Sequence, residues 1–133
     1  MSPAVGPYSP VVRVGEWVIT SGQIGVAPSA DGPKIVDGGT LAELRQAMAN
    51  LAEVLAGEGA TLADVKKTTL FLVDMNDFAV VNEVWVELFG SNRPTRSAVG
   101  VVALPLGALI EVEAWAHVSR RWVESSDPEA PGA

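Results

Sequence analysis

Two segments of this chain carry apolar residues three and four positions apart, the spacing that places side chains on one face of a helix. The first segment follows Thr40, a residue typical of helix N-caps, and ends at Gly57 and Gly59. The second follows Asp77, which we expect to cap it. The apolar stripes are Leu41, Leu44, Met48, Leu51 and Leu55 in the first helix, and Phe78, Val81, Trp85 and Leu88 in the second.

Five other segments are rich in the β-branched and aromatic residues that favour strands. Gly15 and Glu16 separate the first two, which predicts a hairpin. The stretch 26–39 holds several glycines and prolines and predicts a loop with at most a brief extended piece. Residues 61–64 predict a capped turn before the third strand. The predicted strands are 11–14, 17–20, 65–73, 95–104 and 109–118.

The resulting order, β-β-α-β-α-β-β, predicts an α+β domain with one sheet and two helices on one of its faces. Alternation along the last strand indicates what each face carries. The residues that we expect to point toward the helices are Ile110, Val112, Ala114, Ala116 and Val118. Those that point the other way are Leu109, Glu111, Glu113, Trp115 and His117. A face that mixes carboxylates with Leu and Trp predicts a hydrated interface between subunits.

Charge and hydropathy narrow the class of protein. The chain has 133 residues, a net charge of −7 and nine scattered basic residues, so we expect no nucleic-acid partner, which would need clustered Lys and Arg. Its 48% hydrophobic content and mean hydropathy of +0.27 are high for a small protein, which indicates apolar area buried between subunits. The length predicts one domain, residues 1–123, followed by a disordered polar tail, residues 124–133.

Several kinds of chemistry are excluded by composition. Without cysteine the chain has no disulfide and no thiolate nucleophile, and its single histidine, His117, provides neither a His-pair metal motif nor a Ser-His triad. We therefore expect no metal and no cofactor. The N-terminus lacks the pattern of a signal peptide, and no apolar stretch is long enough to span a bilayer. We expect a cytoplasmic protein without a membrane partner.

Arg96 and Glu111 are the main candidates for chemistry. A guanidinium binds a carboxylate through two parallel hydrogen bonds, although Arg96 could instead pair with a nearby acid to stabilise a strand end. Glu111 could act as a base toward water, or be a solvated interface carboxylate. If Glu113 lies close, it raises the pKa of one of the two acids. These groups suit water attack on a small carboxylated substrate.

Three residues near the start of the chain extend this set. Tyr8 follows Gly6 and Pro7, which turn the backbone, and its hydroxyl could orient a substrate or its ring could pack at an interface. Ser21 and Gly22 follow a strand, where a glycine permits close approach of a ligand to backbone N–H groups. The same two residues could equally form a plain turn at the strand end.

The pairing of the last two predicted strands constrains this hypothesis. In a tight hairpin Arg96 would pair near Ala116, so Glu111 would lie about 17 Å away, from about five residues at ~3.3 Å each. A simple hairpin is therefore incompatible with the proposed pair. Either another strand lies between the two, or the site combines groups from two subunits.

Seven short segments occur in an order that resembles one known family. They are Gly6-Pro7-Tyr8-Ser9, Ser21-Gly22-Gln23, Arg45-Gln46-Ala47, Val81-Asn82-Glu83-Val84, Pro94-Thr95-Arg96-Ser97, Leu104-Pro105 and Glu111-Val112-Glu113. From about residue 3 to 119 the chain resembles the RidA/YjgF family of reactive-intermediate imine deaminases. The resemblance implies a chorismate-mutase-like fold and a homotrimer with clefts between neighbouring subunits, in which the last two strands are not simply paired.

The resemblance also implies an activity and the residues that perform it. The activity is hydrolysis of small 2-imino acids, 2-iminobutanoate and 2-iminopropanoate, to 2-keto acids and ammonia without a cofactor. Arg96 matches the arginine that holds the substrate carboxylate, and Glu111 matches the glutamate that positions water and transfers a proton. Positions matching residues near the cleft are Tyr8, Ser21 and Gly22, expected from the adjoining subunit, together with Asn82 and Ala98.

This chain departs from the family pattern at four positions. Ala98 stands where cysteine is frequent, so only its backbone N–H could bind substrate. Leu106 replaces a common lysine, Gly100 a common glutamate and Pro10 a frequent glutamine. Leu106 and Gly100 leave open an enzyme for a larger imine as an alternative to the imine deaminase. A separate alternative is a regulatory protein that binds small keto or amino acids in the same cleft without turnover. The acidic pI and lone histidine disfavour ribonuclease activity.

Overall fold

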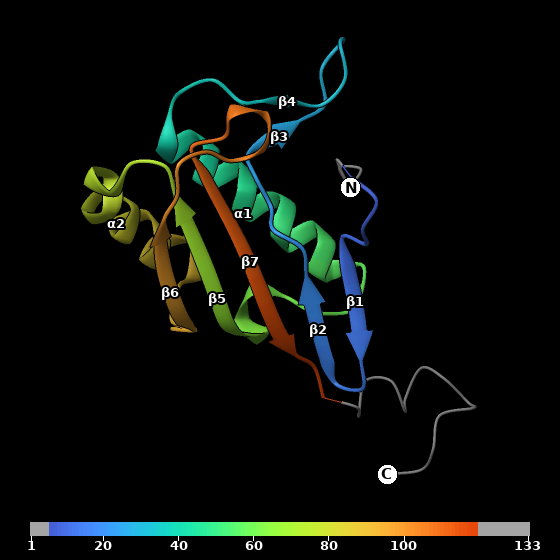
Figure 1. Cartoon of the computed structure of the whole chain (residues 1–133). Coiled ribbons are helices and arrows are strands. Elements are labelled where there is room, and N and C mark those ends of the chain that lie inside the picture. Colours follow the sequence, from blue (N-terminus) through green and yellow to red (C-terminus); the bar gives the residue numbers. More distant parts are fainter. Residues whose placement is uncertain (1–5, 120–133) are drawn as a thin grey trace.

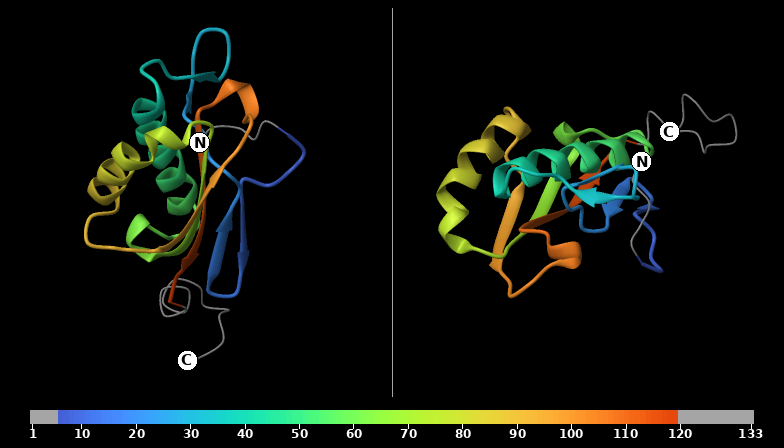
Figure 2. Two further views of the ribbon diagram at one scale, coloured as in Figure 1. Left: turned by 60° about the vertical axis from the view of Figure 1, so that its left-hand side comes forward. Right: turned by 90° about the horizontal axis from the view of Figure 1, so that it is seen from above.

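The computed structural model describes residues 6–119, in which two helices cover one face of a five-stranded sheet and leave the other face open (Figures 1 and 2). The predicted α+β class is confirmed. The strand order is β1-β2-β7-β5-β6. The sheet consists of β1 Val11–Val14, β2 Trp17–Thr20, β5 Val65–Leu72, β6 Thr95–Gly100 and β7 Ile110–His117, and the helices are α1 Thr40–Ala56 and α2 Phe78–Phe89.

The smaller elements lie in the connections. The stretch predicted as a loop forms a short hairpin, β3 Val26–Ala27 with β4 Lys34–Ile35. Three single-turn helices are η1 Leu62–Asp64, η2 Met75–Asp77 and η3 Pro105–Gly107. The predicted tail, residues 124–133, lies outside the described residues. Within residues 6–119, no helix combines the length and apolar character that crossing a membrane requires.

The sheet is apolar on its helix-covered face, as alternation along the last strand predicts. Ile110, Val112, Ala114 and Ala116 are fully buried, whereas Trp115 is 41% exposed on the open face. The core between sheet and helices is formed mainly by Val18, Leu44, Met48, Leu51, Leu55, Leu70, Leu72, Val81, Trp85, Phe89, Ile110 and Val112. Burying these aliphatic and aromatic side chains supplies the main driving force for folding.

The last two strands do not pair with each other, because β5 lies between them. It is parallel to β6, with Thr68 beside Arg96, and antiparallel to β7, with Phe71 beside Glu111. A strand–helix–strand connection gives a parallel pair because the helix returns the chain to the starting end of the sheet. Of the two alternatives to a simple hairpin of the last two strands, the one with another strand between them is therefore confirmed.

The start of α1 differs from the prediction by one residue. Gly39 occupies the N-cap position with φ of 84°, a backbone conformation that favours glycine, so Thr40 is already the first helical residue. Its hydroxyl donates a hydrogen bond of 2.7 Å to the Asp77 carboxylate. Asp77 does occupy the N-cap of α2, but its side chain makes no capping hydrogen bond to that helix. The hydrogen bond from Thr40 to Asp77 instead connects the start of α1 with the start of α2.

Strand β6 ends at Gly100, so the predicted strand 95–104 is wrong over its last four residues. Proline cannot donate to a strand ladder and restricts the residue before it, which explains why the chain leaves the sheet before Pro105. The loop then turns through η3, where Leu106 has a φ of 58°. A leucine rarely adopts this conformation, and its side chain is 58% exposed.

One buried amide fixes the chain between the sheet and the small hairpin. The side-chain NH₂ of Asn50, in α1, donates to the carbonyls of Ile24 and Val26, and its oxygen accepts from Gln46. The Glu43 carboxylate, two helical turns earlier on α1 and also buried, accepts a hydrogen bond from the N–H of Leu109 just before β7. Both loops at this end of the sheet are thus anchored to α1.

We expect Asn50→Ala to lower the free energy of unfolding by about 1–3 kcal/mol, because it removes the donor from two buried carbonyls. Gln46→Ala is the matched control, since it removes a single contact to the same amide and should cost less than ~1 kcal/mol. Urea unfolding at one fixed protein concentration measures both. Equal midpoints for Asn50→Ala and wild type would contradict the assigned anchoring role.

Candidate functional site

Arg96 lies on the helix-covered face near the free edge of the sheet. Its guanidinium donates a 2.8 Å hydrogen bond to the side-chain oxygen of Asn82 in α2. The guanidinium carbon lies 5.3 Å from the ring centroid of Phe78 and 5.1 Å from that of Trp85. Two aromatic faces and an amide therefore hold the cation in one orientation.

The alternative role for Arg96, pairing with an acid of its own chain, finds no support in the described residues. Within residues 6–119, no carboxylate lies within ion-pair distance of this guanidinium. Partial burial lowers its pKa, because losing water disfavours the charged form. A half-buried guanidinium held by a neutral amide and two rings keeps N–H donors available for an anion.

Glu111 lies on the opposite, open face of the sheet. Burial raises the pKa of its carboxyl group, and the neighbouring charge of Glu113 raises it further. The predicted electrostatic coupling between the two acids is therefore present. A carboxyl group with a raised pKa exchanges a proton more readily near neutral pH, which suits a general base or acid.

Gly22 has a different reason to be glycine than the sequence predicts. Gln23 bridges to Val112 through two backbone hydrogen bonds, which brings the chain after β2 alongside β7. A Cβ atom placed on Gly22 would lie only 2.6 Å from the carboxyl carbon of Glu111. The missing side chain thus leaves room for the Glu111 carboxylate.

Ser21 anchors the segment that carries Tyr8. The Ser21 backbone N–H donates to the carbonyl of Pro10 over 2.9 Å, and its hydroxyl donates to the carbonyl of Ser9 over 2.6 Å. The serine proton is therefore already committed within the chain. Tyr8 is 47% exposed, and its ring folds back over Gly6, where an added Cβ would lie 2.9 Å from the ring.

Ala98 presents its backbone at the free edge of β6. The N–H of Val101 donates to the carbonyl of Leu72 in β5. Because successive residues of a strand turn their N–H groups to alternate sides, the N–H of Ala98 points away from β5. Its side chain faces the helices, as that of Arg96 does, and packs against the core. This edge can donate a hydrogen bond to a ligand beside Arg96.

The predicted site residues thus form two groups. The arginine group consists of Asn82, Arg96 and Ala98, and the glutamate group of Tyr8, Ser21, Gly22 and Glu111. In the sheet, Arg96 is level with Ala114, so its Cα lies about 14 Å from that of Glu111, from two strand spacings and three residues along β7. The two side chains also point to opposite faces. One copy of the chain does not bring both groups to the same small molecule.

Two aromatic contributors were not recognised as site residues from the sequence. Phe78 and Trp85 read as members of the apolar stripe of α2, and both do contact the core. Their rings also flank Arg96. The available signal was their spacing from Asn82. Phe78 lies four residues before it and Trp85 three residues after it, which puts both rings on the same helix face as Asn82.

The structure shows the neighbours or the exposure of three positions at which this chain departs from the family pattern: Gly100, Leu106 and Pro10. A Cβ on Gly100 would lie 3.0 Å from the Met75 side chain, so this position faces the start of α2. Leu106 lies at the exposed tip of η3. The carbonyl of Pro10 accepts the hydrogen bond from Ser21.

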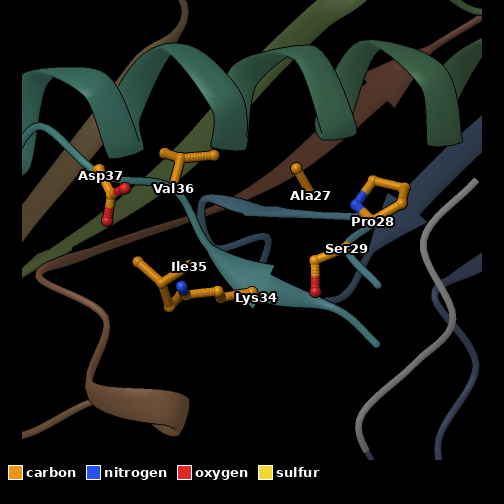
Figure 3. Close-up of a pocket in the computed structure, with 7 residues that line it drawn as sticks. All are labelled: Ala27, Pro28, Ser29, Lys34, Ile35, Val36 and Asp37. Carbon is orange, nitrogen blue, oxygen red and sulfur yellow. The ribbon is translucent and has the colours of Figure 1, made fainter. Parts of the chain in front are cut away.

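Among the cavities formed by residues 6–119, two adjoin these elements. One, of about 330 Å³, is lined by two members of the arginine group and their neighbours, namely Asn82, Trp85, Val86, Arg93, Pro94 and Arg96. The other, of about 210 Å³, lies at the β3–β4 hairpin, and Figure 3 shows Ala27 and Pro28 on one arm with Lys34 and Ile35 on the other. The hairpin cavity contains no predicted site residue. In the described part of the chain, no cluster of acids and histidines is arranged to hold a metal ion.

The open face of the sheet carries exposed apolar side chains. Val12 is 45% exposed, Val14 62% and Trp17 38%, and Trp17 contacts Trp115 edge to face with ring centroids 6.0 Å apart. Lys67 lies over the Trp115 ring. Contiguous apolar surface of this kind, edged by charged groups, is typical of protein–protein contacts.

Comparison with known proteins shows which family has this sequence and fold. The family model described as endoribonuclease L-PSP matches residues 1–118. A human protein named 2-iminobutanoate/2-iminopropanoate deaminase is 46% identical over 111 residues, which cover 84% of this chain and 80% of the human one.

Solved structures agree with the sequence match. The crystal structure of RidA from an Antarctic Psychrobacter bacterium has a TM-score of 0.82 and 38% identity, covering 88% of this chain and 93% of that one. A putative endoribonuclease from Thermotoga maritima has a TM-score of 0.83 and 39% identity, with coverage of 89% and 91%. From the match over nearly its whole described length, the chain belongs to the RidA/YjgF family.

Proposed function

We propose that this protein hydrolyses small 2-imino acids such as 2-iminobutanoate and 2-iminopropanoate to 2-keto acids and ammonia. The observation that carries the proposal is the Arg96 guanidinium, held by Asn82 and two rings with no acid of the described chain beside it. Such a group suits a carboxylate ligand. The human relative, at 46% identity, is named for this activity.

In the proposed reaction Arg96 fixes the substrate by its carboxylate. Water adds to the carbon of the C=N bond while Glu111 accepts one of its protons. That proton passes to the nitrogen and gives a carbinolamine. Glu111 then carries the proton of the new hydroxyl to the same nitrogen while the C–N bond breaks, so that ammonia and the 2-keto acid leave. The outward N–H of Ala98 would donate a hydrogen bond to the bound molecule. Holding substrate and water together accounts for much of the rate gain, because imines also hydrolyse unaided.

The complete site combines two copies of the chain, in a homotrimer of the kind that the family resemblance implies. The arginine group of one copy would face the glutamate group of its neighbour. Two features support this arrangement: Arg96 and Glu111 point to opposite faces of one sheet, and the open face exposes Val14, Trp17 and Trp115. Burying that apolar face against other copies would stabilise the assembly. Tyr8 and Ser21 would border the cleft from the same neighbour.

The position of the histidine and the net charge of the chain fit imine hydrolysis better than cleavage of RNA. The lone histidine, His117, lies six residues along β7 from Glu111, which is about 20 Å, and forms a 3.6 Å contact with Glu16. It therefore cannot act with Glu111 on one phosphodiester in the same half-site. A net charge of −7 also disfavours an RNA surface.

We expect Arg96→Ala to lower kcat/KM on 2-iminopropanoate by about a hundredfold, because it removes charge-assisted hydrogen bonds worth roughly 2–3 kcal/mol. Arg96→Lys should be intermediate, since it keeps the charge but loses the planar fork. The imine is generated freshly by an amino acid oxidase, and semicarbazide competes for what remains. Arg45→Ala, which removes an exposed arginine paired with Glu87, is the control and should match wild type. Wild-type rates for Arg96→Ala would exclude its proposed role.

The shared cleft predicts complementation between two inactive variants. Arg96→Ala, with about a hundredth of wild-type activity, and Glu111→Gln should each be nearly inactive alone. After mixed refolding in equal amounts, about a quarter of wild-type activity should return, since three-quarters of random trimers are mixed and each has one intact cleft of three. Activity that stays at the level of the separate variants, in a mixture shown by mass spectrometry to contain both, would place the site within one copy.

The acidic limb of the pH profile should report Glu111. Its carboxylate is the active base, so kcat/KM falls as pH drops through its raised pKa. Glu113→Gln removes one of the two causes of that elevation, so the limb should move to lower pH. Ionisation of the substrate is the same for both proteins and cancels in the comparison. Glu58→Gln, at the far end of α1, controls for net charge; a limb that moves equally in this control would argue against direct coupling.

A further inference from the structure

The cavity beside Arg96 holds a second arginine that the proposed reaction does not use. Arg93 and Arg96 both line this space of about 330 Å³, on either side of Pro94, with Asn82, Trp85 and Val86 completing the wall. Among residues 6–119, no acidic residue lines this space. In a chain with nine basic and 16 acidic residues, two guanidinium groups sharing one cavity without a carboxylate form a distinctly positive site.

The guanidinium of Arg93 is oriented by one nitrogen and free at the others. Its Nη1 atom donates to the carbonyls of Gly90 and Asn92, just beyond the end of α2. Within the described residues, Nε and Nη2 make no hydrogen bond and no acid forms an ion pair with the group. The backbone thus positions this cation, and the donors that a carboxylate would use stay available.

The short stretch of chain between the two arginines limits the ligand to a short molecule with an acidic group at each end. Three residues of extended chain place their Cα atoms about 10 Å apart at most. Each guanidinium approaches a carboxylate oxygen to about 2.8 Å. Both arginines line one cavity, and its volume of about 330 Å³ lies at the lower end of the range typical for small ligands, so a dicarboxylate of the size of aspartate or glutamate is the ligand class that we consider.

We propose that Arg93 determines specificity by binding a second carboxylate, so that the substrates include dicarboxylic 2-imino acids, the imino counterparts of aspartate and glutamate. This inference rests on the proposed function, because Arg96 holds the carboxylate next to the C=N bond. Arg93 would bind the distal carboxylate and takes no part in the proton transfers. Its effect is therefore on the choice of substrate.

If Arg93 had only a structural role, its substitution would have a different effect on activity. Its contacts to Gly90 and Asn92 satisfy carbonyls at the C-terminal end of α2, where a cation is also favoured by the helix dipole. If that were its whole role, substitution would change stability and would alter activity on all imines alike. A change in the ratio between two substrates separates the two roles.

The test compares 2-iminoglutarate with 2-iminobutanoate, each generated in place by an amino acid oxidase, for wild type and Arg93→Gln. We expect the ratio of kcat/KM for the dicarboxylic over the monocarboxylic imine to fall about tenfold in Arg93→Gln, the loss of one charge-assisted contact of roughly 1.4 kcal/mol. Arg93→Lys should restore part of the ratio. Arg45→Gln is the matched loss of a surface arginine and should leave the ratio unchanged.

A ratio that is the same in Arg93→Gln and wild type would overturn the proposal, as would a wild-type protein inactive on 2-iminoglutarate but active on 2-iminobutanoate. If no imine is hydrolysed, the proposed function fails, and calorimetry still decides the role of Arg93. In that case 2-oxoglutarate should bind wild type about tenfold more tightly than it binds Arg93→Gln. Equal affinity of the two proteins for 2-oxoglutarate would then reject it.

Discussion

The insertion of β5 between β6 and β7 is the constraint on which the rest of this structure depends. Because β5 leads through α2 into β6, the pair is parallel, and β6 becomes the outer strand under that helix. Arg96 therefore meets Asn82 and the rings of Phe78 and Trp85. The same insertion moves β7 inward, where Glu111 faces the open side beside Gly22. The strand order thus separates the arginine group from the glutamate group within one copy of the chain.

Local pattern predicted the elements well, because it depends on interactions a few residues apart. The two helical stripes, the first hairpin and the alternation along β7 were all correct, and each follows from burial with a period of 3.6 or 2. The exact start of α1 was not, since the glycine before Thr40 takes the capping position. The end of β6 was missed as well, although Pro105 was a usable signal there.

Contacts between distant segments were harder to foresee. The order of strands depends on which sheet edge α2 returns to, although the strand–helix–strand pattern itself predicts that β5 and β6 are parallel neighbours. Arg96 and Glu111 could be chosen as candidates from their chemistry, but their separation onto two faces required the register with β5. The aromatic partners of Arg96 were hidden among core residues, because one helix face serves both purposes.

Gly22 and Glu111 have a consequence for how this cleft can change over time. A side chain at position 22 occupies the space in which the Glu111 carboxylate now lies. Any larger residue there is tolerated only if the acid swings away or is itself replaced by something shorter. The two positions are therefore epistatic: the order in which substitutions arrive decides whether an intermediate sequence keeps a correctly placed acid. Divergence toward new substrates is easier at walls that do not touch this pair, such as the arginine-lined cavity under α2.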